Sequence, residues 1–152
     1  MDSFLFVDFT RCIACHACET ACGREHGGAG RLYVMRFENA AVPLACRQCE
    51  AAPCVAMCPE DALVYDEGSG VGLVVERCTR CGLCVAACPF GVMRLGAGPG
   101  GDPVRCDRCR RRREEGRLPV CVLTCPTQAL SVQGRAVVQD RRRIHFTGLR
   151  VS

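Results

Sequence analysis

The sequence has no lysine, no tryptophan and no long hydrophobic run. All 20 basic side chains are therefore arginine, and aromatic residues account for only 5% of the chain. A membrane-spanning helix needs roughly 18 consecutive apolar residues, and no stretch approaches that length. The sequence predicts no direct membrane span, and the scarcity of aromatic side chains predicts a small hydrophobic core.

The N-terminal segment lacks the features of a secretion signal. Residues 1–8 contain no basic region, and Asp8 interrupts their short apolar run. A signal peptide needs a basic start followed by a longer apolar stretch, and a twin-arginine leader is also missing. We therefore expect a cytoplasmic protein, although a partner with its own export signal could carry it across a membrane.

Cysteine, by contrast, is present in excess, at 16 of 152 residues. Such a content is typical either of a secreted disulfide scaffold or of metal ligation. A reducing cytoplasm favours metal ligation. Because the core is small, the bound metal is expected to supply much of the folding free energy.

The cysteines form four groups of four. The most regular group, at residues 78–89, has the spacing C-x2-C-x2-C-x3-C-P, by which bacterial ferredoxins hold a [4Fe–4S] cluster while the fourth cysteine ligates a neighbouring cluster. Zinc ribbons use isolated C-x2-C pairs, so triple-cysteine runs followed by proline favour iron–sulfur clusters over zinc. The first group has Gly23 in place of the proline, and the second and fourth groups carry insertions before their third cysteines.

This sharing of ligands requires the groups to be paired. The two middle groups are adjacent and pair with each other, so the first and last groups pair across the chain. The sequence thus predicts four [4Fe–4S] clusters. Their ligand sets are site 1, Cys12, Cys15, Cys18 and Cys125; site 2, Cys22, Cys106, Cys109 and Cys121; site 3, Cys46, Cys49, Cys54 and Cys88; and site 4, Cys58, Cys78, Cys81 and Cys84.

The predicted fold is α+β, with two ferredoxin-like lobes that duplicate a two-cluster ferredoxin and consist of short helices and antiparallel hairpins. A repeated unit of cysteine, proline, two turn residues and a strand start, at residues 58–63, 88–93 and 125–130, supports duplication. The expected domains are an outer lobe (1–40 and 97–140), an inserted lobe (41–96) and a basic tail (141–152).

Local patterns predict the individual elements. The glycine-rich segment 96–103 is expected to connect the lobes, and the charged insert from residue 110 to begin as a helix that ends near Gly116. The expected strands are 4–9, 32–37, 62–65, 72–76 and 92–95, with a last hairpin formed by 129–132 and 136–138.

Other chemistries have weaker signals. Arginine runs at 110–113 and 141–143 raise the alternative of nucleic-acid binding, but no aromatic platform accompanies them. An iron–sulfur regulator would need a DNA-binding element, and no helix-turn-helix pattern is present. His16, His26 and His145 are not needed as ligands. With no nucleophile–base pair and no phosphate loop, we expect no catalytic residues and no enzyme activity in this chain.

The chain resembles the four-cluster ferredoxin-like electron-transfer subunits of the dimethyl sulfoxide reductase type. The resemblance covers about residues 4–138 and rests on residues 46–54, 106–109, 119–121 and 125–127. That family includes small subunits of formate dehydrogenases, formate hydrogenlyase and tungsten aldehyde oxidoreductases, and the ferredoxin partner of carbon monoxide dehydrogenase. The resemblance implies an electron relay between a catalytic subunit, such as a molybdenum or tungsten pterin enzyme, and a second redox partner.

Two alternatives to this function stay open. The first is a free-standing soluble polyferredoxin that carries electrons without a permanent partner. The second is a relay subunit that also stacks end to end into homo-oligomeric filaments, which four clusters in an extended chain would permit.

Overall fold

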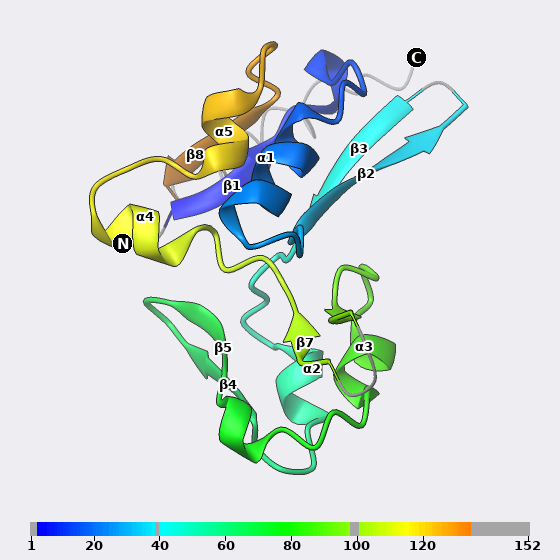
Figure 1. Cartoon of the computed structure of the whole chain (residues 1–152), viewed down its shortest axis with the longest axis vertical. Coiled ribbons are helices and arrows are strands. Elements are labelled where there is room, and N and C mark those ends of the chain that lie inside the picture. The colour runs from blue at the N-terminus through cyan, green and yellow to red at the C-terminus, as the bar shows by residue number, and fades with distance from the viewer. Residues whose placement is uncertain (1–2, 39, 98–100, 135–152) are drawn as a thin grey trace, which may run out of the picture.

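The computed structural model describes residues 3–38, 40–97 and 101–134, whose helices and strands form two groups in space (Figure 1). The upper group contains β1 (Ser3–Val7), α1 (Ala17–Glu25), β2 (Leu32–Phe37), β3 (Ala40–Ala45), α4 (Arg110–Glu114), α5 (Val120–Thr124) and β8 (Leu130–Gly134). The lower group contains α2 (Pro53–Ala56), β4 (Leu63–Asp66), β5 (Gly70–Leu73), α3 (Leu83–Ala87), β6 (Arg94–Leu95) and β7 (Pro103–Val104). This small α+β architecture of short helices and antiparallel ribbons agrees with the predicted fold class.

The strand β1 pairs with β8 and so joins the two ends of the described chain. The pairing is antiparallel, with Leu5 opposite Val132. The expected first strand ends at Val7 because the Asp8 carboxylate accepts a hydrogen bond from the Thr10 N–H (3.1 Å) and caps a short 3-10 turn, η1 (Phe9–Arg11). The strand expected at 129–132 is confirmed as β8, but its partner is β1; residues 136–138 lie outside the described residues, as does the tail at 141–152.

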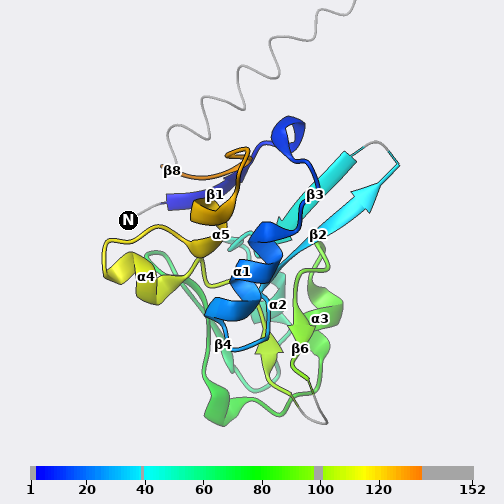
Figure 2. The same ribbon diagram turned by 45° about the horizontal axis from the view of Figure 1, so that its top comes forward.

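The ribbon of β2 and β3 was only half expected. The pattern at 32–37 correctly predicts β2, whereas β3 has an alanine-rich sequence with Pro43 inside it. Proline cannot donate to a strand ladder and is confined to edge positions. A two-stranded ribbon, in which Pro43 lies opposite Val34, provides such an edge. Figure 2 shows this ribbon extending away from α1.

The cysteine–proline steps end the short helices, as the sequence predicts. α3 and α5 stop at the last cysteine of their groups, Cys88 and Cys125, because the following proline cannot continue a helix. In the first group, where Gly23 replaces that proline, α1 runs through Cys22 to Glu25. The helix expected in the charged insert is confirmed as α4, which ends before Gly116.

In the lower group, the observed hairpins differ from the expected ones in the bounds of their strands. β4 and β5 form the expected ribbon, but its return strand begins at Gly70, and the 3-10 turn η2 (Val75–Arg77) replaces its end. β6 pairs with β7, so the segment that was expected to connect the lobes lies between two paired strands of the lower group; residues 98–100 are outside the described residues. The chain returns to the upper group only after β7.

Each of the two groups has its own hydrophobic core. The upper core has seven buried residues, of which four are cysteines, packed around Leu32 and Leu130. The lower core has six buried residues, among them Leu63, Met93 and two cysteines. None of the helices in the described part of the chain is long and apolar enough to cross a membrane.

Several side chains connect the two groups, among them Gln48. Gln48 is buried, donates to the Cys106 carbonyl (2.6 Å) and accepts from the Val71 N–H (2.7 Å). We call this contact region between the loop at 46–49 and the segment 104–108 the seam. Gly70 lies against the same amide, and a Cβ on Gly70 would overlap the Gln48 side-chain oxygen.

We expect the substitution Gly70→Ala to destabilise the protein by about 2–4 kcal/mol. Gly70 has a φ of +80°, where an L-residue costs roughly 1–2 kcal/mol, and the overlap with buried Gln48 adds to this cost. The check is the midpoint of anaerobic thermal unfolding, followed by circular dichroism.

Gly27→Ala is the matched control. Gly27 also has a positive φ (+65°), but a Cβ there would meet no atom within 4 Å. It should cost only the backbone part of the penalty. Equal losses for the two variants would show that the contact with Gln48 contributes nothing.

Candidate metal centres

The four cysteine groups share one feature of backbone conformation. The residue just before the second cysteine has a left-handed conformation in every group: Ala14, Gln48, Arg80 and Arg108, with φ of 55°, 52°, 60° and 57°. None of them is glycine, so each carries the roughly 1–2 kcal/mol cost of that conformation. Such strain persists only where surrounding structure or a ligand fixes it. The repeat of this turn in all four groups is the structural counterpart of the C-x2-C spacing that they share.

A second such feature follows the last cysteine of three groups. The third residue after it also has a positive φ, at Asp61, Gly91 and Gln128. This turn directs the next backbone N–H back to sulfur in two of these groups, from Ala62 to Cys58 (3.3 Å) and from Ala129 to Cys125 (3.2 Å).

These N–H groups affect the thiols electrostatically. Partial burial opposes ionisation of both Cys58 and Cys125, but backbone N–H donors outweigh it and lower the pKa of each thiol. At Cys125 the Thr127 hydroxyl, 3.7 Å from the sulfur, acts in the same direction. Donors aimed at sulfur favour the thiolate, which is the form that binds metal.

The pKa values of the more deeply buried thiols are raised instead of lowered. Burial raises the pKa of Cys18 to about 11 and that of Cys106 to about 12, and it raises the pKa of Cys121 further. Neighbouring thiolates add to each shift. Without a cation these sulfurs stay protonated in the folded chain, whereas a bound metal would deprotonate them.

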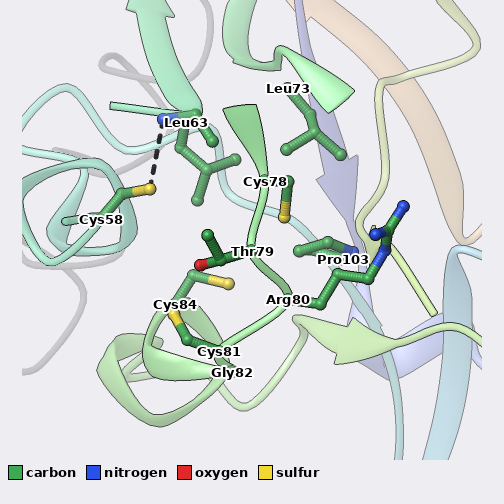
Figure 3. A pocket seen from close by; sticks show the side chains of 11 residues that line it. Cys58, Leu63, Leu73, Cys78, Thr79, Arg80, Cys81, Gly82, Cys84 and Pro103 are labelled. Atoms are coloured by element: carbon green, nitrogen blue, oxygen red, sulfur yellow. Dashed lines mark hydrogen bonds between the residues drawn. The ribbon is translucent and has the colours of Figure 1, made fainter. Parts of the chain in front are cut away.

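Four sulfurs of the lower group surround one cavity (Figure 3). Cys78, Cys81 and Cys84 come from one group, and Cys58, held by the Ala62 N–H, comes from the preceding group. Leu63, Leu73 and Pro103 form the apolar wall. The cysteines predicted for site 4 are thus brought together, with three ligands from one loop and one from another.

A second cavity has the same composition in the upper group. It is lined by Cys12, Cys15, Cys18 and Cys125, the residues predicted for site 1, with an apolar wall that includes Val34 and Leu130. Here the fourth cysteine comes from the far end of the described chain, and the pairing of β1 with β8 brings it there.

The other two predicted sets also gather. Cys22, Cys106 and Cys109 all raise the pKa of Cys121 after its burial, which places site 2 around α5 and the end of α1. In the lower group, Cys49 and Cys88 raise the pKa of Cys46, and Cys46 and Cys88 raise that of Cys54, which are the members of site 3. Cys18 of site 1 also raises the pKa of Cys121, so these sulfurs lie near one another while their division into four ligand sets stays a prediction.

The exposure of the cysteines differs between the sites. Cys15 of site 1 and Cys81 of site 4 are exposed, whereas the cysteines of sites 2 and 3 are buried or half-buried. Within the described residues, no three cysteine, histidine or acidic side chains lie close enough to share a single metal ion.

The arginine run of α4 is held by this chain itself. Arg112 pairs with Glu25 (3.3 Å) and donates to the Leu118 carbonyl (2.9 Å), and Arg113 donates to the Arg108 carbonyl (2.9 Å). These bonds fasten the insert of the fourth group over α1. His16 pairs with Glu19 (2.8 Å), and His26 Nε2 lies 3.8 Å from Cys109 Sγ. His145 lies outside the described residues.

Sequence reasoning missed Gln48 and Arg105, two of the polar side chains at the seam. Gln48 is buried, and Arg105 has a side-chain nitrogen shielded from water. Their positions beside cysteines were visible, but an isolated glutamine or arginine in a cysteine loop gives no signal of burial.

Comparison with known protein families decides which metal group these sulfurs hold. A family model described as a 4Fe-4S dicluster domain matches residues 37–135, and one described as a 4Fe-4S binding domain matches residues 9–25. The chain belongs to the 4Fe-4S dicluster domain family. The two matches contain all 16 cysteines, so the zinc alternative is rejected in favour of [4Fe–4S] clusters.

Several Escherichia coli (strain K12) proteins are similar along most of their length. The electron transport protein HydN is 35% identical, with 86% of this chain and 87% of HydN covered. Formate hydrogenlyase subunit 2 is 34% identical, with 86% and 81% covered. The protein YsaA is 35% identical, with 93% and 96% covered.

The residues present fit such clusters. The donors are thiol sulfurs in an apolar setting, and several backbone N–H groups point at them. Bound clusters would supply one-electron redox chemistry. The chain's own residues supply the rest: they fix the sulfurs, shield them from water and donate hydrogen bonds to them.

Removal of the clusters is expected to unfold the chain. The upper core is largely cysteine, and without iron its thiols neither bridge the loops nor offset the strain of the left-handed turns. After treatment with mild acid and chelator under reducing conditions, the cooperative thermal transition and the amide proton dispersion should disappear.

Protein carried through the same buffers without acid or chelator is the control, and reconstitution with iron and sulfide should restore both signals. A cluster-free chain that keeps a dispersed proton spectrum would contradict this expectation.

Proposed function

We propose that this protein is an electron-transfer subunit that relays single electrons through four [4Fe–4S] clusters, between a catalytic oxidoreductase subunit and a second redox partner. The ligand sets are those of sites 1 to 4, and the two element groups are the two lobes of a duplicated ferredoxin. The chain performs no bond chemistry of its own.

The observation that carries the proposal is the continuity of cysteines through the two packed cores. The upper core contains Cys18 of site 1, Cys106 and Cys121 of site 2, and has Cys46 of site 3 packed against it. Cys84 of site 4 shares the lower core with Cys54 of site 3. The four sites therefore form a series from Cys15 to Cys81, the two exposed cysteines, and a series open at both ends suits a relay between two partners.

The names of the relatives support the same role. HydN is an electron transport protein, and formate hydrogenlyase subunit 2 is part of a named enzyme complex. By analogy, the catalytic partner we favour is a molybdenum or tungsten pterin enzyme that acts on formate, carbon dioxide or an aldehyde, with a carbon monoxide dehydrogenase as the other option.

HydN favours a second candidate function, because its name describes a carrier and not a subunit. The chain would then be a soluble polyferredoxin that visits its partners. Anaerobic size exclusion of the native protein from its source separates the two: a relay subunit elutes with a much larger partner, and a carrier elutes at its own mass.

Iron analysis tests the number of clusters. Anaerobically purified protein should contain 16 iron atoms and 16 acid-labile sulfides per chain, as four cubes with four of each require. The assay is colorimetric iron and sulfide against protein measured by amino-acid analysis. A content of about eight iron atoms per chain would correspond to two clusters and would contradict a relay of four.

Serine substitutions test the pairing of cysteines. Cys88→Ser should damage site 3, although Cys88 belongs to the cysteine group that supplies site 4. Its matched partner, Cys58→Ser, should damage site 4 and spare site 3. Paramagnetic resonance of the reduced proteins would show two different signals altered. If each variant instead lost the cluster of its own group, the exchange of fourth ligands would be wrong.

A further inference from the structure

An arginine lies at the seam with part of its charge shielded from water. Arg105 follows β7 and directly precedes Cys106 of site 2. Its Nε is buried and has no hydrogen-bond partner. No carboxylate in residues 3–38, 40–97 or 101–134 forms an ion pair with it. A half-buried guanidinium without a carboxylate partner is costly, so another anion is expected to balance it.

The anion that best fits as the partner of the Arg105 guanidinium is the sulfur of Cys46, in site 3. Cys46 packs against the core that contains Cys106, and Gln48 fixes the Cys46 loop to the Cys106 carbonyl at 2.6 Å. Cys46 is the foremost charged group that acts on Arg105, and Arg105 is in turn the foremost charged group that acts on Cys46.

Two acidic side chains beside the inner sites are each paired with an arginine. Asp107, next to site 2, pairs with Arg31 at 2.5 Å. Glu25, which raises the pKa of Cys109, pairs with Arg112 at 3.3 Å. Among the described residues, no carboxylate forms such an ion pair with Arg105, so its charge is available to a cysteine site.

We propose that Arg105 raises the reduction potential of the cluster held at site 3, and so makes this the preferred resting place for an electron at the seam. The inference rests on the proposed function and its ligand sets. Reduction adds one negative charge to a cluster. A fixed cation nearby, shielded from water, stabilises that charge more than an exposed cation does. Arg105 acts through this field and is a tuning residue.

The test is a redox titration of the intact, iron-replete protein followed by paramagnetic resonance. The signal of site 3 is identified beforehand as the one that Cys49→Ser alters. Arg105→Gln should shift the midpoint of this signal to lower potential, equivalent to about a tenfold change in its reduced-to-oxidised ratio, or about 59 mV for one electron. Arg105→Lys keeps the charge and should keep most of the midpoint.

Arg47→Gln is the matched control. Arg47 lies in the same loop as Cys46 and Gln48, but it is exposed and stacks over Phe90, with its Cζ 5.2 Å from the ring centroid. Water screens such a charge, so its removal should shift the site 3 midpoint by less than a third as much as Arg105→Gln does.

Three results would overturn the inference. They are unchanged midpoints in iron-replete Arg105→Gln, a shift in Arg105→Lys as large as that in Arg105→Gln, and a shift confined to the signal that Cys109→Ser alters. Should Arg105→Gln lose iron, Arg105→Met supplies a second neutral variant. Loss of site 3 in both, but not in Arg105→Lys, supports the requirement for charge, and loss in all three refutes it. A wild-type protein without four reducible clusters would instead refute the proposed function.

Discussion

The central constraint on this chain is that a thiolate cannot be buried without compensation. Burial, with a contribution from neighbouring negative charges, raises the pKa of Cys18 to about 11 and that of Cys106 to about 12, from an ordinary value of 9.0. Iron supplies the largest part of the compensation, and the backbone supplies the rest through N–H groups aimed at sulfur. The short helices and two-stranded ribbons are too small to form a large hydrophobic core by themselves. Their purpose is to place sulfur, which explains why cysteine takes up so much of both cores.

The sequence predicted the parts of the fold that proline and cysteine determine. The helix ends at Cys88 and Cys125 followed from the next residue alone, because proline excludes a continued helix in any context. The gathering of the predicted ligand sets followed from the rule that loops exchange their fourth cysteine. The first prediction depends on local chemistry that does not vary with tertiary contacts, whereas the second depends on a known rule of ligand exchange between loops.

What the sequence did not predict depends on contacts between distant segments. β3 lacks strand propensity and exists because β2 lies beside it, and β8 pairs with β1 across nearly the whole chain. The seam is the clearest case, since nothing local distinguishes buried Gln48 from exposed Arg47 one residue before it. Burial at such positions is a property of the assembled groups and cannot be read from a cysteine loop in isolation.

The pairing of β1 with β8 has a consequence for synthesis of the protein. Translation proceeds at about 5–20 residues per second, so roughly six seconds or more pass between the appearance of Val7 and that of its partner Leu130. During that time the N-terminal thiols have neither their partner strand nor Cys125. On the proposed ligand sets, the inserted lobe can be loaded with iron while the ribosome is still at work, and the outer lobe only near the end. The cysteines that are synthesised first would then be the last to bind iron. They would therefore be exposed to oxygen for the longest time.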